Sequence, residues 1–238
     1  EPTQELTHLK FIEKKLDLGD IIGVERDLFK TQRGALTVFA KKLTLLCKSL
    51  LPLPDKHSGL ADIGVCYRKR WLDLIINPES LARFRLRSKI LFAIRKYFEE
   101  ASFEEVETPI LQNTYGGATA RPFTTHLLAL HQDMYLRIAL EISLKKLIVG
   151  GMKKIYEIGK NFRNEGIDRT HNPEFTMLEA YAAGWDYNDM MEFTENLFET
   201  LALELFNDTK IPFTPESTAQ AIVVDLKTPW KRLSMKEA

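Results

Sequence analysis

The chain has 238 residues, of which 45% are hydrophobic and 28% are charged, as is typical of a globular protein. Its 33 basic and 33 acidic residues balance, which excludes a bulk positive field, so any contact with nucleic acid must be local. Cys47 and Cys66 lack metal-ligand spacing and fit the reduced thiols of a cytoplasmic protein. No apolar run is long enough to span a bilayer, so we expect no membrane partner.

The N-terminal fifty residues predict a small β-structure. A short helix is expected over residues 6–15. After the turn at residues 17–20, short strands are expected over 21–29, 36–39 and 43–46, with Gly34 in the first tight link. Three such strands cannot close a barrel alone. A small β-domain without a ligand is an equally good interpretation of this pattern.

Residues 51–64 form a linker rich in proline and glycine, and a long helix is expected from Pro78 to Ala101. Its apolar positions recur near the helical period, and its remaining surface is basic. A basic helix is usually a solvated face, and RNA contact is the less usual explanation. Residues 103–110 then predict a strand that is closed by Pro109. The apolar stripe comprises Phe84, Ile90, Leu91, Ile94, Tyr97 and Phe98.

The segment from Gly116 to His126 is rich in glycine but lacks the lysine and the following helix of a P-loop. A strand is expected over residues 134–138, and a helix over 139–149 ends at Gly150-Gly151. Glu141 lies in the first turn of this helix. Compensation of the helix dipole is the ordinary explanation for a glutamate at that position.

Residues 154–183 are the most informative stretch of the chain. Strands are expected over 155–165 and 174–181, joined by a polar connection with turn formers at Gly166, Asp168 and Asn172-Pro173. Since side chains alternate along a strand, each strand presents several polar side chains on one face. Grouping so many ionisable side chains is costly unless a ligand pairs with them. The side chains concerned are Arg163, Glu165, Phe175, Glu179 and Tyr181.

The last part of the chain predicts a helix capped by Asp186 or Asn188 and running to about Phe206, and then a strand over 221–226. Ser234 and Glu237 have the spacing of a capping box, which predicts the start of a further helix. A helix start without a helix is unstable. We therefore expect the sequence to be a fragment of a longer protein or an incomplete record of it.

The chain contains the string Phe162-Arg163-x-Glu165, followed by a loop and then by His171-Asn-Pro-Glu-Phe175. This pattern resembles motif 2 of the class II aminoacyl-tRNA synthetases. The fuller string RNEGIDRTHNPEFTMLEAY is similar to the lysyl-tRNA synthetase version. The helix, strand and proline up to Pro109 resemble motif 1, the dimer interface of that family. The resemblance implies an α+β fold, a class II synthetase-type antiparallel sheet flanked by helices and preceded by a partial OB-fold β-barrel. It assigns 1–50 to a partial anticodon-binding domain, 51–66 to a linker and 67–238 to the N-terminal part of the catalytic domain.

The resemblance implies ATP-dependent activation of L-lysine to lysyl-adenylate and its transfer to tRNA(Lys) by a cytoplasmic homodimer. Arg163 would be the catalytic residue. The family pattern suggests no settled role for Arg169. A salt-bridged sheet face is the ordinary explanation for Glu179 and Tyr181 taken alone. The implied ATP-binding residues are Arg163, Glu165, His171, Asn172 and Phe175, and the implied lysine-binding residues are Gly117, Glu141, Arg163, Glu179 and Tyr181.

Motif 3 is absent from the sequence, so the ligands of Mg²⁺ are expected beyond residue 238 and no metal site is expected in this chain. Three alternatives remain open. The first is an aspartyl- or asparaginyl-type synthetase, but such an enzyme would not place Glu179 against the side chain of an acidic substrate. The second is a paralogue that lysylates proteins rather than tRNA, but such a protein would lack the anticodon-binding region at residues 20–50. The third alternative is a catalytically inert fragment that serves in dimerisation or binding.

Overall fold

A computed structural model describes residues 14–51, 53–54, 60, 62–215 and 220–237. It divides into two compact units, residues 1–85 and 86–238, which we describe separately. The helix predicted over residues 6–15 lies almost entirely outside the described residues. The domain boundaries expected from the sequence remain a prediction.

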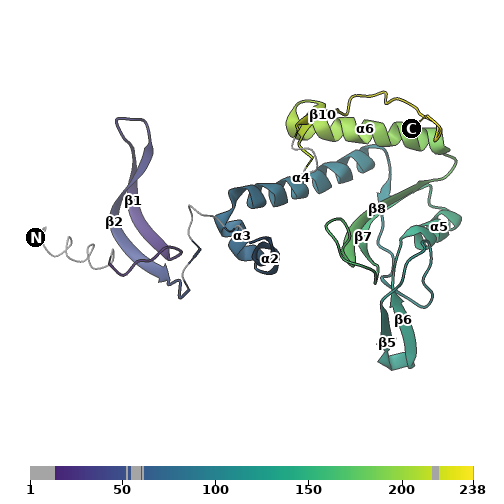
Figure 1. Ribbon diagram of the computed structural model, residues 1–238, viewed down its shortest axis with the longest axis horizontal. Coiled ribbons are helices and arrows are strands. Elements are labelled where there is room, and N and C mark those ends of the chain that lie inside the picture. The colour runs from purple at the N-terminus through teal and green to yellow at the C-terminus, as the bar shows by residue number, and fades with distance from the viewer. Residues whose placement is uncertain (1–13, 52, 55–59, 61, 216–219, 238) are drawn as a thin grey trace, which may run out of the picture. The chain divides into compact units, whose positions relative to one another are not determined.

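The first unit contains a long antiparallel hairpin of β1 (Ile21–Lys30) and β2 (Leu36–Cys47) (Figure 1). The prediction of two separate strands after residue 35 is wrong, because β2 is continuous. Glu25 pairs with Lys42 while the next residue pairs with Ala40, so Lys41 is an extra residue in a β-bulge. The bulge accommodates two consecutive lysines without ending the strand. The hairpin is consistent with the partial OB-fold expected from the sequence.

Two short helices, α2 (Ile63–Arg68) and α3 (Arg70–Ile76), follow in the first unit, and neither was predicted. Asp62 caps α2, because its carboxylate accepts a hydrogen bond from the Val65 N–H at 3.0 Å. The long helix α4 spans Pro78–Glu100 and agrees with the prediction to within one residue.

The second unit contains a three-stranded sheet in the order β3-β7-β8. β7 (Lys154–Phe162) and β8 (Glu174–Ala182) are antiparallel, and β3 (Glu104–Glu105) pairs with β7 in parallel. β7 ends three residues before the predicted boundary of 165. Beyond it, the Asn164 N–H donates to the Arg121 carbonyl at 2.8 Å, so the chain has left β8.

A second sheet is built from β4 (Leu111–Gln112), β5 (Thr124–Leu127) and β6 (Gln132–Leu136), in the order β4-β6-β5. β5 was not predicted, because it lies at the end of a glycine-rich segment that favours a loop. A 3₁₀ turn, Leu128–Leu130, joins β5 to β6.

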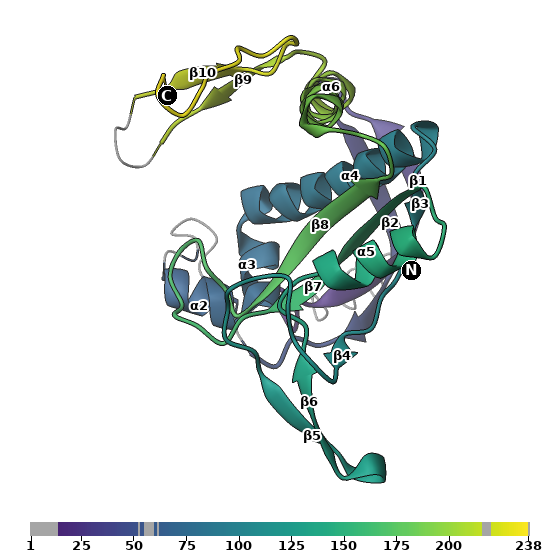
Figure 2. The ribbon, with the colours of Figure 1, turned by 90° about the vertical axis from the view of Figure 1, so that its right-hand side faces the viewer.

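Helices cover the two faces of the β7–β8 pair (Figure 2). On one face, Phe98 of α4 and Phe193 of α6 (Tyr187–Phe206) pack with Tyr156 in an aromatic cluster. On the other face, α5 (Glu141–Val149) packs Leu144 against the strands. This layering confirms the α+β class, and it leaves the polar side of the strands next to α5.

The elements after the sheet agree with the sequence in outline. Asp186 caps α6, accepting hydrogen bonds from the backbone N–H of Asn188 and Asp189 at 2.7 and 3.2 Å. The predicted strand over 221–226 is β10 (Ile222–Asp225), which pairs with the unpredicted β9 (Lys210–Phe213).

Candidate active site

The face of the sheet next to α5 carries the alternate residues of β8 that the sequence predicts to share one face. In the antiparallel register Glu157 pairs with Glu179, and Asn161 pairs with Phe175. Directly paired residues project from the same face, so two rows of alternate residues form one surface. The rows are Ile155, Glu157, Gly159 and Asn161 on β7, and Phe175, Met177, Glu179 and Tyr181 on β8.

The predicted nucleotide residues line one cavity of about 500 Å³ beyond the end of β7. The guanidinium carbon of Arg163 lies 5.2 Å from the centre of the Phe175 ring, within cation–π range. The Arg163 Nε–H donates to the Ile138 carbonyl at 3.4 Å, which directs the side chain across the sheet. The cavity is lined by Arg163, Glu165, Gly166, Ile167, Asp168, Thr170, His171, Asn172 and Phe175.

Glu165 is positioned by a turn rather than by the strand that was expected to carry it. Its backbone N–H donates to the carbonyl of Arg163 at 2.9 Å, and its carboxylate accepts from the Arg121 N–H at 3.3 Å. The glycine-rich segment that contains Arg121 is thus hydrogen-bonded to the mouth of the cavity.

Asp168 organises the loop between the two strands. Its carboxylate accepts hydrogen bonds from the Thr170 N–H at 2.7 Å and the His171 N–H at 2.8 Å. It also lies 2.8 Å from His171 Nδ1. The Thr170 N–H, together with the His171 side chain, lowers the pKa of Asp168 to about 2. The loop therefore has a defined conformation, although the side chain of His171 remains exposed.

The other end of the face carries the residues predicted to bind lysine. The Glu179 carboxylate accepts from the Leu140 N–H at 3.4 Å and from the Tyr181 hydroxyl at 3.1 Å. Burial raises the pKa of Tyr181, and the negative charges of Glu179 and Glu141 raise it further. The phenol is therefore a hydrogen-bond donor at neutral pH, and Glu141 is close enough for its charge to act on it.

Gly117 contacts the start of α5 through its backbone. Its φ of +86° lies in the left-handed region, and a Cβ there would be 3.1 Å from the Cβ atoms of Ala139 and Glu141. A side chain would be strained and crowded at this position. Glu141 forms an ion pair with Lys145 one turn later, at 2.5 Å. The structure therefore brings Gly117 beside Glu141.

A buried ion pair beneath this face was not predicted from the sequence. Arg137 Nη1 lies 2.5 Å from Glu157 Oε1, and both side chains are nearly fully buried. Arg137 also donates to the carbonyls of Lys160 (Nε, 2.8 Å) and Thr108 (Nη1, 2.9 Å). An arginine within the apolar run Met134–Ile138 was the available signal, because a charge on a buried strand needs a partner.

Asn161 is a second residue of this face that was not predicted. It is fully buried, and its Nδ2–H donates to the sulfur of Met177 at 3.3 Å. Its Oδ1 has no hydrogen-bond partner among the described residues. Its place on β7 between the buried ion pair and Arg163 makes it part of the floor of the face.

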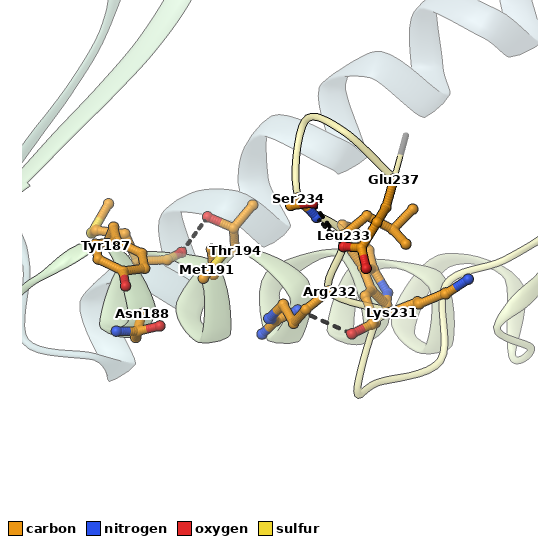
Figure 3. A pocket seen from close by; sticks show the side chains of 11 residues that line it. Tyr187, Asn188, Met191, Thr194, Lys231, Arg232, Leu233, Ser234 and Glu237 are labelled. Carbon is orange, nitrogen blue, oxygen red and sulfur yellow. Dashed lines mark hydrogen bonds between the residues drawn. The ribbon is translucent and has the colours of Figure 1, made fainter.

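A larger cavity, of about 940 Å³, lies between α6 and the segment Trp230–Glu237, and contains none of the predicted site residues (Figure 3). The Arg232 guanidinium forms an ion pair with Glu195 at 2.7 Å, and the carboxylate of Glu237 accepts from the Ser234 N–H at 2.9 Å. The latter bond is one half of the capping box that the sequence predicts. The Arg232–Glu195 pair fastens the C-terminal segment to α6, and neither contact carries evident chemistry.

The described residues were expected to contain neither a metal site nor a membrane span. Among the described residues, no group of three or more histidine, cysteine, aspartate or glutamate side chains is arranged to hold a metal ion. In the same part of the chain, no helix combines the length and apolar character that crossing a membrane needs.

This chain is similar to known proteins over most of its length. A family model described as tRNA synthetases class II (D, K and N) matches residues 62–238. A lysine–tRNA ligase of Chlamydia pneumoniae is 58% identical over 234 residues, which is 98% of this chain and 44% of that protein. A lysine–tRNA ligase of Enterococcus faecalis is 53% identical over 225 residues, 94% of this chain and 44% of that protein. The chain thus spans less than half the length of these relatives.

Proposed function

This chain belongs to the class II tRNA synthetases of the D, K and N group, and from that membership we propose that its parent protein activates L-lysine with ATP and transfers it to tRNA(Lys). One observation carries the choice of substrate. A single sheet face bears a cation against an aromatic ring at one end, and a carboxylate bonded to a phenol at the other. The first arrangement suits a nucleotide, and the second suits the ε-ammonium group of lysine.

In the proposed reaction, a carboxylate oxygen of lysine attacks the α-phosphorus of ATP, and pyrophosphate leaves. The chain needs to supply positioning and charge compensation rather than covalent chemistry. The planar fork of Arg163 suits both the lysine carboxylate and the α-phosphate. Phe175 would stack on the adenine ring, and Glu165 would accept from its amino group. His171 and Asn172, on the rim of the same cavity, would contact the triphosphate.

Lysine carries two ammonium groups, and the face offers a carboxylate for each. Glu141, together with the backbone of Gly117, would hold the α-amino group. Glu179 and Tyr181 would hold the ε-ammonium, since the Tyr181 hydroxyl donates to Glu179 and leaves its own oxygen free to accept. An aspartyl or asparaginyl substrate would place an acidic or neutral side chain against Glu179. The lysine assignment is therefore preferred within this family.

Mg²⁺ belongs to the chemistry of this family, but the described residues do not form a site for it. We propose that its ligands lie in another part of the parent protein. We further propose a cytoplasmic homodimer that uses residues 1–50 as part of an anticodon-binding OB-fold, 51–66 as a linker and 67–238 as part of the catalytic domain.

The test is lysine-dependent pyrophosphate exchange by the intact parent protein. Arg163→Ala should lower the rate at least ~100-fold, because it removes the cation that compensates the reacting phosphate. Glu179→Gln should raise the KM for lysine and reduce the preference over analogues that lack the ε-amino group, with a loss of about 2–4 kcal/mol.

Glu141→Gln is the matched control, since it should weaken lysine and those analogues equally. Unchanged discrimination in Glu179→Gln would make that carboxylate a structural hydrogen-bond partner only. An Arg163→Ala rate within a few-fold of the wild type would contradict the catalytic assignment.

A further inference from the structure

Two glutamates are neighbours on adjacent strands at the proposed substrate site. Glu157 on β7 and Glu179 on β8 are direct partners in the antiparallel ladder and project from the same face. The Cβ atoms of such partners lie about 4.5–5.5 Å apart, and like charges at that spacing destabilise the folded state. Glu157 is 3% exposed, so water cannot screen the repulsion. Something must compensate the charge of Glu157 if both groups are to be ionised.

Arg137 provides that compensation. Its Nη1 pairs with Glu157 Oε1 at 2.5 Å. The second oxygen, Oε2, accepts from the Thr108 hydroxyl at 2.7 Å and the Thr108 N–H at 3.1 Å. Both oxygens of Glu157 are thus engaged. By contrast, Glu179 accepts from two neutral donors, the Leu140 N–H and the Tyr181 hydroxyl.

Gly159, two residues after Glu157 on β7, leaves room for this ion pair. A Cβ on Gly159 would lie 2.2 Å from Arg137 Nη2 and 3.0 Å from Glu157 Oε1. The backbone of β3 pairs with β7 at Ile155 and Tyr156. Farther along β7, at Lys160, the backbone carbonyl accepts a hydrogen bond from the side chain of Arg137. The guanidinium therefore occupies space that a strand with side chains at every position would fill.

We propose that the Arg137–Glu157 pair is a positioning element of the substrate site, which neutralises Glu157 so that the ε-ammonium of the substrate meets the charge of Glu179 rather than that of two adjacent carboxylates. The inference rests on the proposed lysine-activating function. The charged and titratable groups around the pair are Arg137 beyond β6, Glu157 on β7, Glu179 and Tyr181 on β8, and Glu141, already paired with Lys145, on α5.

Arg137→Met separates charge compensation from packing. Glu157 would remain buried without its cation beside Glu179, and two adjacent carboxylates share a proton rather than both ionise. Glu179 would then bond to Glu157 in place of the substrate. We expect the KM for lysine to rise at least about 10-fold, while the KM for ATP stays within about 3-fold.

The matched control is the double variant Arg137→Met with Glu157→Leu. It loses the same arginine hydrogen bonds, but it leaves no second carboxylate beside Glu179. We expect its KM for lysine to return to within about 3-fold of the wild type. Arg137→Lys keeps the charge and should behave like the double variant, which preserves the test if either Met variant folds poorly.

A second readout does not depend on lysine activity. In Arg137→Met the carboxylate of Glu157 is buried without its cation, so we expect the folded state to lose stability as the pH rises and a charge at this buried site becomes more costly. Urea unfolding between about pH 5 and 8 should show this loss in Arg137→Met and not in the wild type or the double variant.

Identical KM values and identical pH profiles in the single and double variants would overturn the proposal, and the pair would then act only in packing. Absence of lysine-dependent exchange in the wild-type protein would instead defeat the proposed function. In that case the unfolding profiles would still decide whether Arg137 compensates Glu157.

Discussion

Gly159 interrupts β7 between Glu157 and Asn161, at a position where strands usually carry β-branched or aromatic side chains. A Cβ at this position would lie 2.2 Å from Arg137 Nη2, so the glycine leaves room for the guanidinium. We expect Gly159→Ala to lower the free energy of unfolding by about 1–3 kcal/mol, because the buried guanidinium must shift away from its partners. Chemical denaturation monitored by fluorescence measures the loss.

Gly166 provides the control for this substitution. A Cβ at Gly166 would meet no atom within 4 Å, and no left-handed φ constrains the residue. Gly166→Ala should therefore leave the stability within about 0.5 kcal/mol of the wild type. Equal effects of the two substitutions would show that Arg137 has room to move.

Single residues also show how far a sequence can predict this site. Alternation along β8 predicts that Phe175, Glu179 and Tyr181 share a face, and the register agrees. The buried partner of Glu157 could not be predicted in the same way, because Arg137 reaches it from another segment, 20 residues away. Alternation assigns faces within one strand, whereas contacts between segments depend on how the strands are packed.

At the scale of secondary-structure elements, α5 determines the shape of the lysine end. Its first residue is Glu141, and its Leu144 is completely buried against Leu140 and Ile155, with Tyr181 packed at the edge of the cluster. The helix thus fixes Glu141 relative to β8 by apolar packing. We expect Leu144→Ala to cost about 2–5 kcal/mol in the free energy of unfolding, since it leaves a cavity in this cluster.

Val149 lies on the same helix and is 88% exposed. Val149→Ala should change the stability by no more than about 0.5 kcal/mol, as expected for a surface position. Differential scanning calorimetry of both variants makes the comparison. A similar loss in both would show that the burial of Leu144 does not decide the stability of α5.

The elements were predicted well where the periodicity was long, and poorly where a partner determines the structure. α4 and α6 follow their helical stripes to within one or two residues. β3 is confined to Glu104–Glu105, although the sequence favours strand to Pro109. The reason lies outside the strand, because the Thr108 N–H donates to the Glu157 side chain instead of to the backbone of β7.

At the scale of the whole molecule, the predicted dimer surface must be narrower than the apolar stripe of α4. Phe98 is buried in the aromatic cluster of its own chain, and Ile94 and Tyr97 pack against that cluster. The buried Phe98 is therefore unavailable to a second copy, whereas Ile94 and Tyr97 keep part of their surface exposed. Phe92, on the same helix, lies outside the cluster and is 69% exposed.

The last prediction follows from this division of α4. A two-fold interface places the same patch on both subunits, so one substitution acts twice. If α4 forms the proposed dimer interface, Phe92→Glu should place two carboxylates in an apolar contact and weaken the dimer at least about 100-fold, since each buried unpaired charge costs several kcal/mol. Sedimentation equilibrium of the intact parent protein measures the dissociation constant. Leu130→Glu is the control, because Leu130 is 67% exposed in the turn between β5 and β6. An unchanged dissociation constant in Phe92→Glu, or a monomeric wild type at high concentration, would place the dimer contact elsewhere or remove it.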